Sequence, residues 1–129
     1  MLPNGHVLQA CEWDNITFDY DPSTNTYSNQ QPTLGTVDES AWVKLQDSST
    51  LFVNMGTTAS ERYIPALGQW IADGTVPVQL YDPYGFETGP GFMLPNGHVI
   101  YFGSPPVTAY YIPWESKSRN IPSGTSDSK

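Results

Sequence analysis

Short apolar runs alternate with turn-forming residues along the whole chain. Runs rich in Val, Ile, Tyr, Phe and Thr are bounded by Gly, Pro, Asn and Asp, which is the pattern of β-strands joined by tight turns. We therefore predict an almost entirely β chain with no helix longer than about one turn. The expected strands are 7–11, 16–20, one at Tyr27, 41–45, 50–54, 60–63, 69–72, 91–94, 98–102 and 107–111, and 76–81 could form an extra strand.

One hairpin sequence occurs more than once. Met-Leu-Pro-Asn-Gly-His-Val at residues 1–7 recurs letter for letter at 93–99. Asn-Gly readily adopts positive φ at both corners of a two-residue type I′ turn, so each copy predicts a β-hairpin of that type. A degraded third copy lies at residues 44–51, where Asp47-Ser48 stands in place of Asn-Gly.

A Tyr-x-Pro motif follows each hairpin at a nearly constant distance. Its tyrosines, Tyr20, Tyr63 and Tyr111, lie 18, 18 and 17 residues after the hairpin leucines Leu2, Leu45 and Leu94. An aromatic residue follows seven residues later in the first two cases, at Tyr27 and Trp70. Leucine spacings of 43 and 49 residues favour propeller blades over helical solenoids. The repeats that we expect are approximately 1–38, 39–86 and 87–129, and the first and last could share a blade across chains.

These motifs resemble a known family. The hairpin sequence, followed by Tyr-Asp-Pro-Ser-Thr-Asn-Thr-Tyr in the first repeat and Tyr-Ile-Pro-Ala-Leu-Gly-Gln-Trp in the second, resembles the kelch-like repeats of bacterial β-propellers related to the central domain of galactose oxidase. The resemblance covers nearly the whole chain and implies three kelch-like blades. The likeness is divergent, because Gln9-Ala10 replaces the Gly-Gly pair that ends the second strand of a kelch blade. It also implies an extracellular protein, but it says little about activity, since propellers carry unrelated functions.

Composition and charge limit the classes of partner that the chain is expected to bind. The chain has 129 residues, of which 13% are aromatic and only 14% charged, with 12 Pro and 11 Gly. The formal net charge is −8, with five basic residues, so nucleic acid and anionic membranes are not expected as partners. A cationic ligand, calcium or solubility alone would each fit this charge. No apolar run approaches the ~20 residues of a membrane span, and residue 1 opens directly into a repeat, not a signal peptide.

Candidate chemistry is sparse, and we expect no catalytic residue, metal or cofactor. His6 and His98 each follow Asn-Gly directly and are interpreted as exposed turn residues. Cys11, the single cysteine, is interpreted as a half-buried apolar residue. The copper site of galactose oxidase needs a crosslinked Cys-Tyr pair with further Tyr and His ligands, and that set cannot be placed here. Some carboxylates could bind calcium, but they lack the Asp-x-Asp-x-Asp-Gly spacing and are interpreted as turn caps: Asp14, Asp19 and Asp21.

The best candidate for a binding surface is a set of loops opposite the hairpins. We expect the loops at 12–15, 54–60 and 103–107 to lie together with the long connection 73–90. Aromatic rings among carboxylates suit carbohydrate or protein recognition; the alternative is that the rings only pack between blades. The candidate binding residues are Glu12, Trp13, Asp14, Tyr81, Asp82, Tyr84, Phe86 and Glu87.

Two functions remain open at this stage. The favoured one is a non-enzymatic propeller module that assembles with itself and acts as a binding or structural scaffold. The alternative is a glycan-active hydrolase or oxidase whose site is built from loops of several blades. Self-assembly is expected because the first repeat lacks the inner strand that 41–45 and 91–94 supply to the others, which leaves an open edge. Segment 115–129 of another chain could supply that strand, and two chains would then close a six-bladed ring. In the rival reading, the chain is a fragment of a longer propeller.

Overall fold

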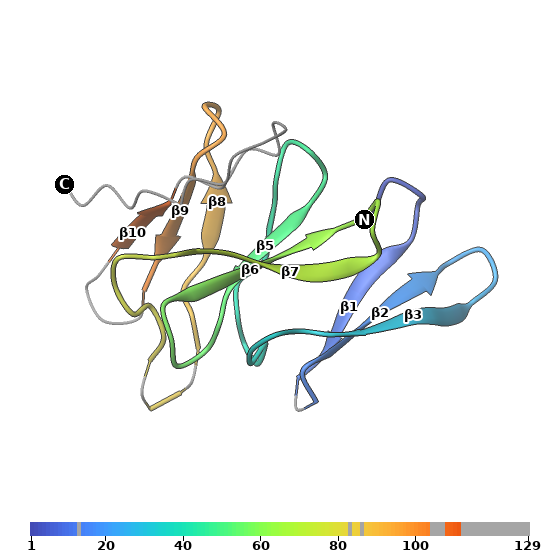
Figure 1. The fold of residues 1–129 in the computed structure, drawn as a ribbon, viewed down its shortest axis with the longest axis horizontal. Coiled ribbons are helices and arrows are strands. Elements are labelled where there is room, and N and C mark those ends of the chain that lie inside the picture. Colours follow the sequence, from blue (N-terminus) through green and yellow to red (C-terminus); the bar gives the residue numbers. More distant parts are fainter. Residues whose placement is uncertain (13, 83, 86, 104–107, 112–129) are drawn as a thin grey trace.

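The chain forms three small β-sheets that lie side by side in chain order (Figure 1). The computed structural model describes residues 1–12, 14–82, 84–85, 87–103 and 108–111. Within these residues the chain is all-β and contains no helix, as the sequence predicted, and every sheet is antiparallel. The described part of the chain accordingly has no helix that is long and apolar enough to cross a bilayer.

Each strand overlaps a predicted one. The first sheet contains β1 (Val7–Cys11), β2 (Ile16–Asp21) and β3 (Thr26–Pro32). The second contains β4 (Val43–Lys44), β5 (Thr50–Val53), β6 (Ala59–Ile64) and β7 (Gln69–Thr75). The third contains β8 (Gly91–Met93), β9 (Val99–Phe102) and β10 (Thr108–Tyr111).

The extra strand predicted at 76–81 is wrong, because this segment is a loop. Its alternating apolar residues have another use: Val76 and Leu80 are buried in the core between the second and third sheets. Pro77 between them has no backbone N–H to give to a strand ladder. The apolar alternation therefore reflects a loop that covers the core.

The three hairpin turns are built alike. In each, the leucine N–H donates to the carbonyl oxygen four residues later, at 2.7, 2.8 and 2.7 Å in chain order. The side-chain oxygen of Asn4, Asp47 or Asn96 accepts a hydrogen bond from the backbone N–H two residues later, at 3.0, 2.9 and 3.1 Å. The degraded copy thus folds in the same way as the two intact copies.

The type I′ turn predicted from Asn-Gly is wrong. Asn4 does not have a positive φ, whereas Gly5 has a φ of 85° and donates its N–H to the Leu2 carbonyl oxygen at 3.0 Å. The observed turn lies one residue earlier than predicted, with Pro3 and Asn4 at its corners, and the Pro3 ring holds φ at about −65°, the value that the first corner of a type I turn takes. The result is a three-residue loop closed by a left-handed residue, a role that Ser48 (φ 69°) takes in the second sheet.

The motif tyrosines occupy the same register position in all three sheets. Each pairs with the residue that follows the hairpin leucine by five positions: Val7 with Tyr20, Thr50 with Tyr63 and Val99 with Tyr111. In the first two sheets the tyrosine also pairs with the later aromatic residue, Tyr27 or Trp70. Residues of different sheets can therefore be matched one to one by register.

Two apolar cores lie on the two faces of the middle sheet. Side chains alternate between the faces along a strand, so Phe52 on β5 points toward the first sheet while Leu51 and Val53 point toward the third. The core shared with the first sheet contains Leu2, Val37, Phe52, Tyr63 and Trp70. The core shared with the third sheet contains Val43, Leu45, Leu51, Val53, Val76, Leu80, Val99 and Tyr101.

The linker between the first two sheets is held by a buried carboxylate. Glu61 on β6 is 1% exposed and accepts hydrogen bonds from the backbone N–H groups of Leu34 (2.7 Å) and Gly35 (2.5 Å). Burial raises the pKa of Glu61, although these hydrogen bonds act in the opposite direction. The linker is thus attached to the middle sheet by side-chain chemistry as well as by packing.

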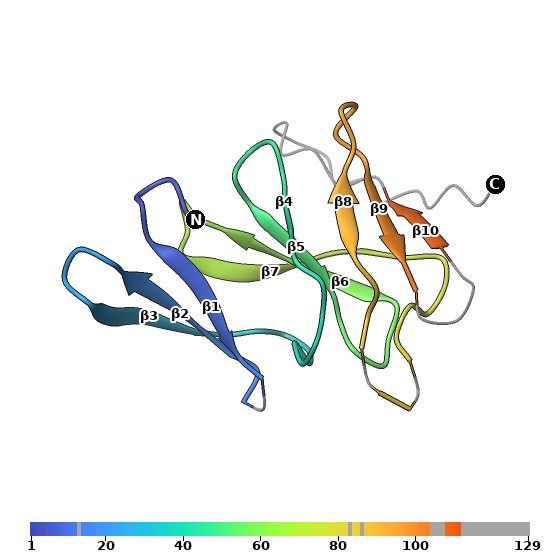
Figure 2. The ribbon, with the colours of Figure 1, turned by 180° about the vertical axis from the view of Figure 1, so that it is seen from behind.

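The first strand of the first sheet has one unpaired edge, whereas the equivalent strands of the other two sheets are paired on that side by an additional strand. β4 lies beside β5 and β8 lies beside β9, but β1, which corresponds to β5 and β9, is an edge strand in the described part of the chain (Figure 2). This matches the expected gap at the inner position of the first repeat. The segment 115–129, expected to fill that gap in another chain, lies outside the described residues.

Candidate functional site

The predicted loop residues occur at the edge of the molecule opposite the leucine turns (Figure 1). Trp13 and Phe86 lie outside the described residues. The remaining candidates divide into exposed residues, Glu12, Asp14, Tyr84 and Glu87, and half-buried ones, Tyr81 and Asp82. Loop 103–107 lies almost entirely outside the described part, so its place on this face stays a prediction.

Part of this surface is an acidic cluster centred on Glu39, which the sequence did not single out. Glu39 and Glu87 form an isolated parallel β-bridge. A side-chain hydrogen bond that the protonated Glu39 carboxyl donates to Glu87, followed by the negative charges of Glu87, Glu12 and Asp38, raises the pKa of Glu39. The structure therefore brings Glu12 and Glu87 to one place. No group of three or more His, Cys, Asp or Glu residues in the described ranges is arranged to hold a metal ion.

The rest of the surface is a closed loop that displays Tyr84. The Asp82 N–H donates to the Glu87 carbonyl oxygen at 2.8 Å, and the Asp82 side chain accepts from the Tyr84 N–H at 2.9 Å. The Tyr84 residue is 93% exposed as a result. The described part of the loop thus carries one exposed aromatic ring, that of Tyr84, and the carboxylates of Asp82 and Glu87.

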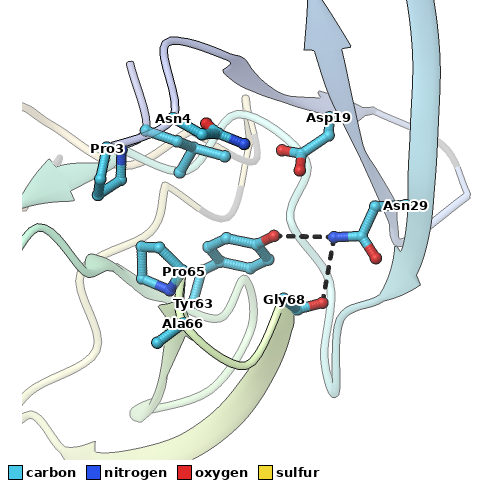
Figure 3. Close-up of a pocket in the computed structure, with 9 residues that line it drawn as sticks. Pro3, Asn4, Asp19, Asn29, Tyr63, Pro65, Ala66 and Gly68 are labelled. Atoms are coloured by element: carbon cyan, nitrogen blue, oxygen red, sulfur yellow. Dashed lines mark hydrogen bonds between the residues drawn. The ribbon is translucent and has the colours of Figure 1, made fainter.

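A cleft of about 320 Å³ lies at the other edge, between the first leucine turn and the β6–β7 turn (Figure 3). Its walls are largely apolar and come from Leu2, Pro3, Pro65, Ala66 and the Tyr63 ring. The polar groups that line it belong to Asn4, Asp19, Asn29 and Gly68. The Tyr-x-Pro motif of the second repeat therefore contributes one side of the cleft, and the repeated hairpin contributes the other.

Asn29 and Tyr63 form a satisfied polar pair in the cleft. The Asn29 amide nitrogen donates to the Tyr63 hydroxyl oxygen (3.0 Å) and to the Gly68 carbonyl oxygen (3.3 Å). The Asn29 amide oxygen accepts from the Gln31 side chain at 3.0 Å. Burial, with the nearby Asp19 charge, raises the pKa of Tyr63, so the phenol stays protonated at neutral pH.

Asp19 is the unsatisfied group of the cleft. Its residue is 8% exposed, and its Oδ1 atom accepts no hydrogen bond from the described residues. Figure 3 shows the carboxylate pointing into the same space as the Tyr63 hydroxyl. The turn-cap role predicted for Asp19 is wrong: β2 turns this side chain toward the second sheet, on the face that also carries Thr17, whose hydroxyl accepts a bond from the Trp70 indole at 2.8 Å.

His6 lies next to Asp19 but does not line the cleft. The prediction that His6 is an exposed turn residue is wrong. The ring is half-buried, with Nδ1 3.9 Å from Asp19 Oδ2 and Nε2 3.9 Å from Asp21 Oδ2. Asp21 does act as a turn cap, accepting hydrogen bonds from the Ser23 backbone (2.8 Å) and hydroxyl (2.7 Å) and from the Thr24 hydroxyl (2.9 Å). The sequence could not show this cluster, because it depends on how the turn folds back on β2.

The Asp21 cap predicts a pH effect. Hydrogen bonds from Ser23, then Thr24, lower the Asp21 pKa from 3.8 to about 2, so the cap stabilises the fold fully above pH 3.8 and is lost as pH falls through about 2. A carboxyl NMR titration should show this midpoint, and Ser23→Ala should move it upward. Ser28→Ala, an exposed serine on the neighbouring strand β3, should leave it unchanged. A midpoint near 3.8 in the unsubstituted protein would refute the cap.

A third surface is the outer face of the third sheet. Phe92 on β8 pairs with Ile100 on β9, and Phe102 is two residues further along β9, so the three share one face. Phe92 is 54% and Phe102 42% exposed, with their ring centroids 6.3 Å apart. Exposed apolar faces of this kind often mark interaction sites.

Comparison with models of known protein families finds no match to this chain, and comparison with curated proteins finds none either.

Proposed function

We propose that the chain is a non-enzymatic β-propeller module that assembles head to tail with a second copy of itself and serves as a binding or structural scaffold for carbohydrate or protein. The observation that carries this proposal is the exposed apolar face of the third sheet. The loop surface with Tyr84, Asp82 and Glu87 would be the face presented to a carbohydrate or protein partner.

The partner that we propose for the outer face of the third sheet is a second copy of the chain. The support comes from residues that occupy the same register position in different sheets. Ile100 and Phe102 on β9 correspond to Leu51 and Val53 on β5, counted from the hairpin leucines. Leu51 and Val53 are fully covered by the third sheet, with exposures of 0% and 2%. The third sheet thus presents the same kind of face that the second sheet buries against its follower.

The opposite end of the molecule carries a matching face. On the middle sheet, Tyr63 and Trp70 pack toward the first sheet, with ring centroids 5.4 Å apart. Their equivalents on the first sheet, Tyr20 and Tyr27, have centroids 4.9 Å apart and point outward, and Tyr27 is 59% exposed. The last sheet of one copy would therefore pack on the first sheet of the next, as neighbouring sheets do within the chain.

Two copies joined in this way would form six sheets in a closed ring. A head-to-tail contact forms rings when its rotation closes and filaments when it does not, and a ring of two copies satisfies both end faces. The edge of β1 would gain a pairing strand from the neighbouring copy, which removes an exposed ladder of backbone groups. Six blades lie within the range in which propellers close.

Phe102→Asp is expected to dissociate the assembly, because it places a carboxylate in an apolar contact. The unsubstituted chain should sediment near twice 14.3 kDa, and the variant should weaken association by about 100-fold or more. Leu67→Asp is the matched control, because Leu67 is 61% exposed but lies on the β6–β7 turn, away from both end faces. Sedimentation equilibrium measures both.

Mixing two variants tests the head-to-tail geometry itself. Tyr27→Asp should dissociate the assembly from the other end. A mixture of the Phe102→Asp and Tyr27→Asp chains should recover one-to-one dimers, because the intact third sheet of one meets the intact first sheet of the other. Recovery also shows that both variants are folded. A folded, unsubstituted monomer at all concentrations, or a mixture that stays monomeric beside dimeric unsubstituted protein, would contradict the proposal.

A further inference from the structure

We infer that the cleft between the first leucine turn and the β6–β7 turn binds a small organic cation, an ammonium or guanidinium group on a short apolar stem. This cleft is separate from the outer faces of the first and third sheets, which we propose for assembly, and from the loop surface that carries Asp82, Tyr84 and Glu87. The inference rests on two observations. The nearly buried carboxylate of Asp19 lines a cleft with apolar walls, and its Oδ1 atom has no hydrogen-bond donor among the described residues.

Asp19 supplies the recognition group. Asp19 is 8% exposed, and a buried carboxylate oxygen that accepts no hydrogen bond costs free energy that a donor on a ligand would recover. The nearest cation-forming group is His6, whose Nδ1 is 3.9 Å from Oδ2, so Oδ1 remains without a donor. Figure 3 shows the Asp19 carboxylate pointing into the space of the cleft, where a ligand could donate to it.

In the second sheet, the position equivalent to Asp19 is occupied by the basic residue Arg62. Asp19 pairs with Leu8 as Arg62 pairs with Leu51, so the two residues occupy equivalent positions and face the following sheet. Arg62 is 2% exposed and lies 3.5 Å from both Asp47 and Asp73. Between the second and third sheets a guanidinium is thus built into the chain. Between the first and second sheets the chain places a carboxylate, and a cleft of about 320 Å³ lies beside it.

The remaining lining favours a single cationic head over a neutral sugar. Both N–H groups of the Asn29 amide are already used by Tyr63 and Gly68, so the cleft lacks the several converging polar groups that orient a polyol. No Lys or Arg occurs among its described lining residues. The walls formed by Pro3, Pro65 and the Tyr63 ring suit an alkyl stem, and an aromatic ring near the head attracts a cation.

The test uses n-butylammonium and n-butylguanidinium chloride as probes, with n-butanol as the neutral analogue and glucose as a sugar. Backbone and side-chain amide shifts of Asn29 and the Tyr63 ring report binding by NMR. We expect the two cations to shift these signals at millimolar concentration and n-butanol to bind roughly tenfold more weakly or not at all. Added salt should weaken the cations only modestly, because the contact is partly buried.

Two substitutions make the result specific. Asp19→Asn keeps the shape and removes the charge, and it should weaken cation binding roughly tenfold or more. Asp21→Asn is the matched control: it removes a carboxylate equally close to His6 that does not line the cleft, and it should change binding less than about twofold. Ala66→Phe should block the cleft while leaving Asp19 intact, so the inference does not depend on the Asp19 variant alone.

Several outcomes would overturn the inference. They are the absence of any shift with either cation, equal binding of n-butanol and n-butylammonium, and cation binding that survives both Asp19→Asn and Ala66→Phe. Glucose binding that is unaffected by Asp19→Asn would show a neutral-sugar site instead. The titrations can be repeated on the Phe102→Asp variant, which is expected to be monomeric. A failure of cation binding can therefore be distinguished from a failure of the proposed assembly.

Discussion

Arg62→Ala is expected to lower the free energy of unfolding by about 3–5 kcal/mol, or to prevent folding if the total stability is at the low end of the usual ~5–15 kcal/mol. The Arg62 side chain is 2% and the Asp73 side chain 3% exposed, with 3.5 Å between Nη2 and Oδ1. Removing the guanidinium leaves the Asp73 charge buried without its cation. Asp47 loses the same partner but is 40% exposed, so water compensates much of that loss.

The control for this prediction is Lys44→Ala. Lys44 donates to the Met1 carbonyl oxygen at 2.7 Å but is exposed, so its loss should cost less than about 0.5 kcal/mol. Replacing both Arg62 and Asp73 by apolar residues of similar volume should recover much of the stability, because neither charge of this pair then remains in the interior. Urea unfolding measures all three. A cost below about 1 kcal/mol for Arg62→Ala would show that water already solvates this pair.

Trp70→Ala is the second substitution with a large expected effect, about 3–5 kcal/mol. Trp70 is 6% exposed, and its ring contacts those of Trp42, Phe52 and Tyr63 at centroid distances of 5.4, 5.0 and 5.4 Å. Its indole N–H also donates to Thr17, across the gap between the sheets. The substitution therefore removes both the centre of one core and a buried hydrogen bond between two sheets.

Tyr27→Ala is the matched control, because Tyr27 has the equivalent register position on the first sheet but is 59% exposed. In the monomer this change should cost less than about 1 kcal/mol. Thermal unfolding at a protein concentration below that of assembly gives the comparison. Equal losses for the two variants would mean that the first sheet's outer face is already covered within one chain.

The strand positions could be predicted from the sequence because they depend on local signals. Turn-forming residues separate the successive strands of each sheet, and the spacing from hairpin leucine to motif tyrosine recurs in the register of all three sheets. The turn type differs from the prediction because Pro3, whose fixed φ suits the first corner of a type I turn, moves the corners one residue toward the N-terminus. Segment 76–81 was mispredicted because apolar alternation does not distinguish a strand from a loop that packs on a core.

The sites were harder to predict, because they depend on contacts between sheets. The exposed loop residues Tyr84 and Glu87 could be named from the sequence, since a long polar connection has to lie at the surface. The roles of Asp19, interpreted from the sequence as a turn cap, and of Arg62 could not be predicted, because an acidic or basic residue within a strand does not reveal which neighbour it meets. Glu39 was missed for the same reason: only the pairing with Glu87 gives it a role. Matching the repeats by register would have shown Asp19 and Arg62 as equivalent positions.

The two identical hairpins have a consequence for how the chain folds. Leu2 is 6% exposed and Leu94 is only half-buried, yet the hydrogen bond donated by the leucine N–H measures 2.7 Å in both turns, and the one accepted by the asparagine side chain measures 3.0 and 3.1 Å. The seven residues therefore form the same turn in two different surroundings. Hairpins closed by so local a signal form within roughly 1–10 μs, which makes the β4–β5 and β8–β9 hairpins natural nuclei of folding. The slower event is then the docking of preformed hairpins across the linkers, so substitutions at the turns should alter the folding rate more than the unfolding rate.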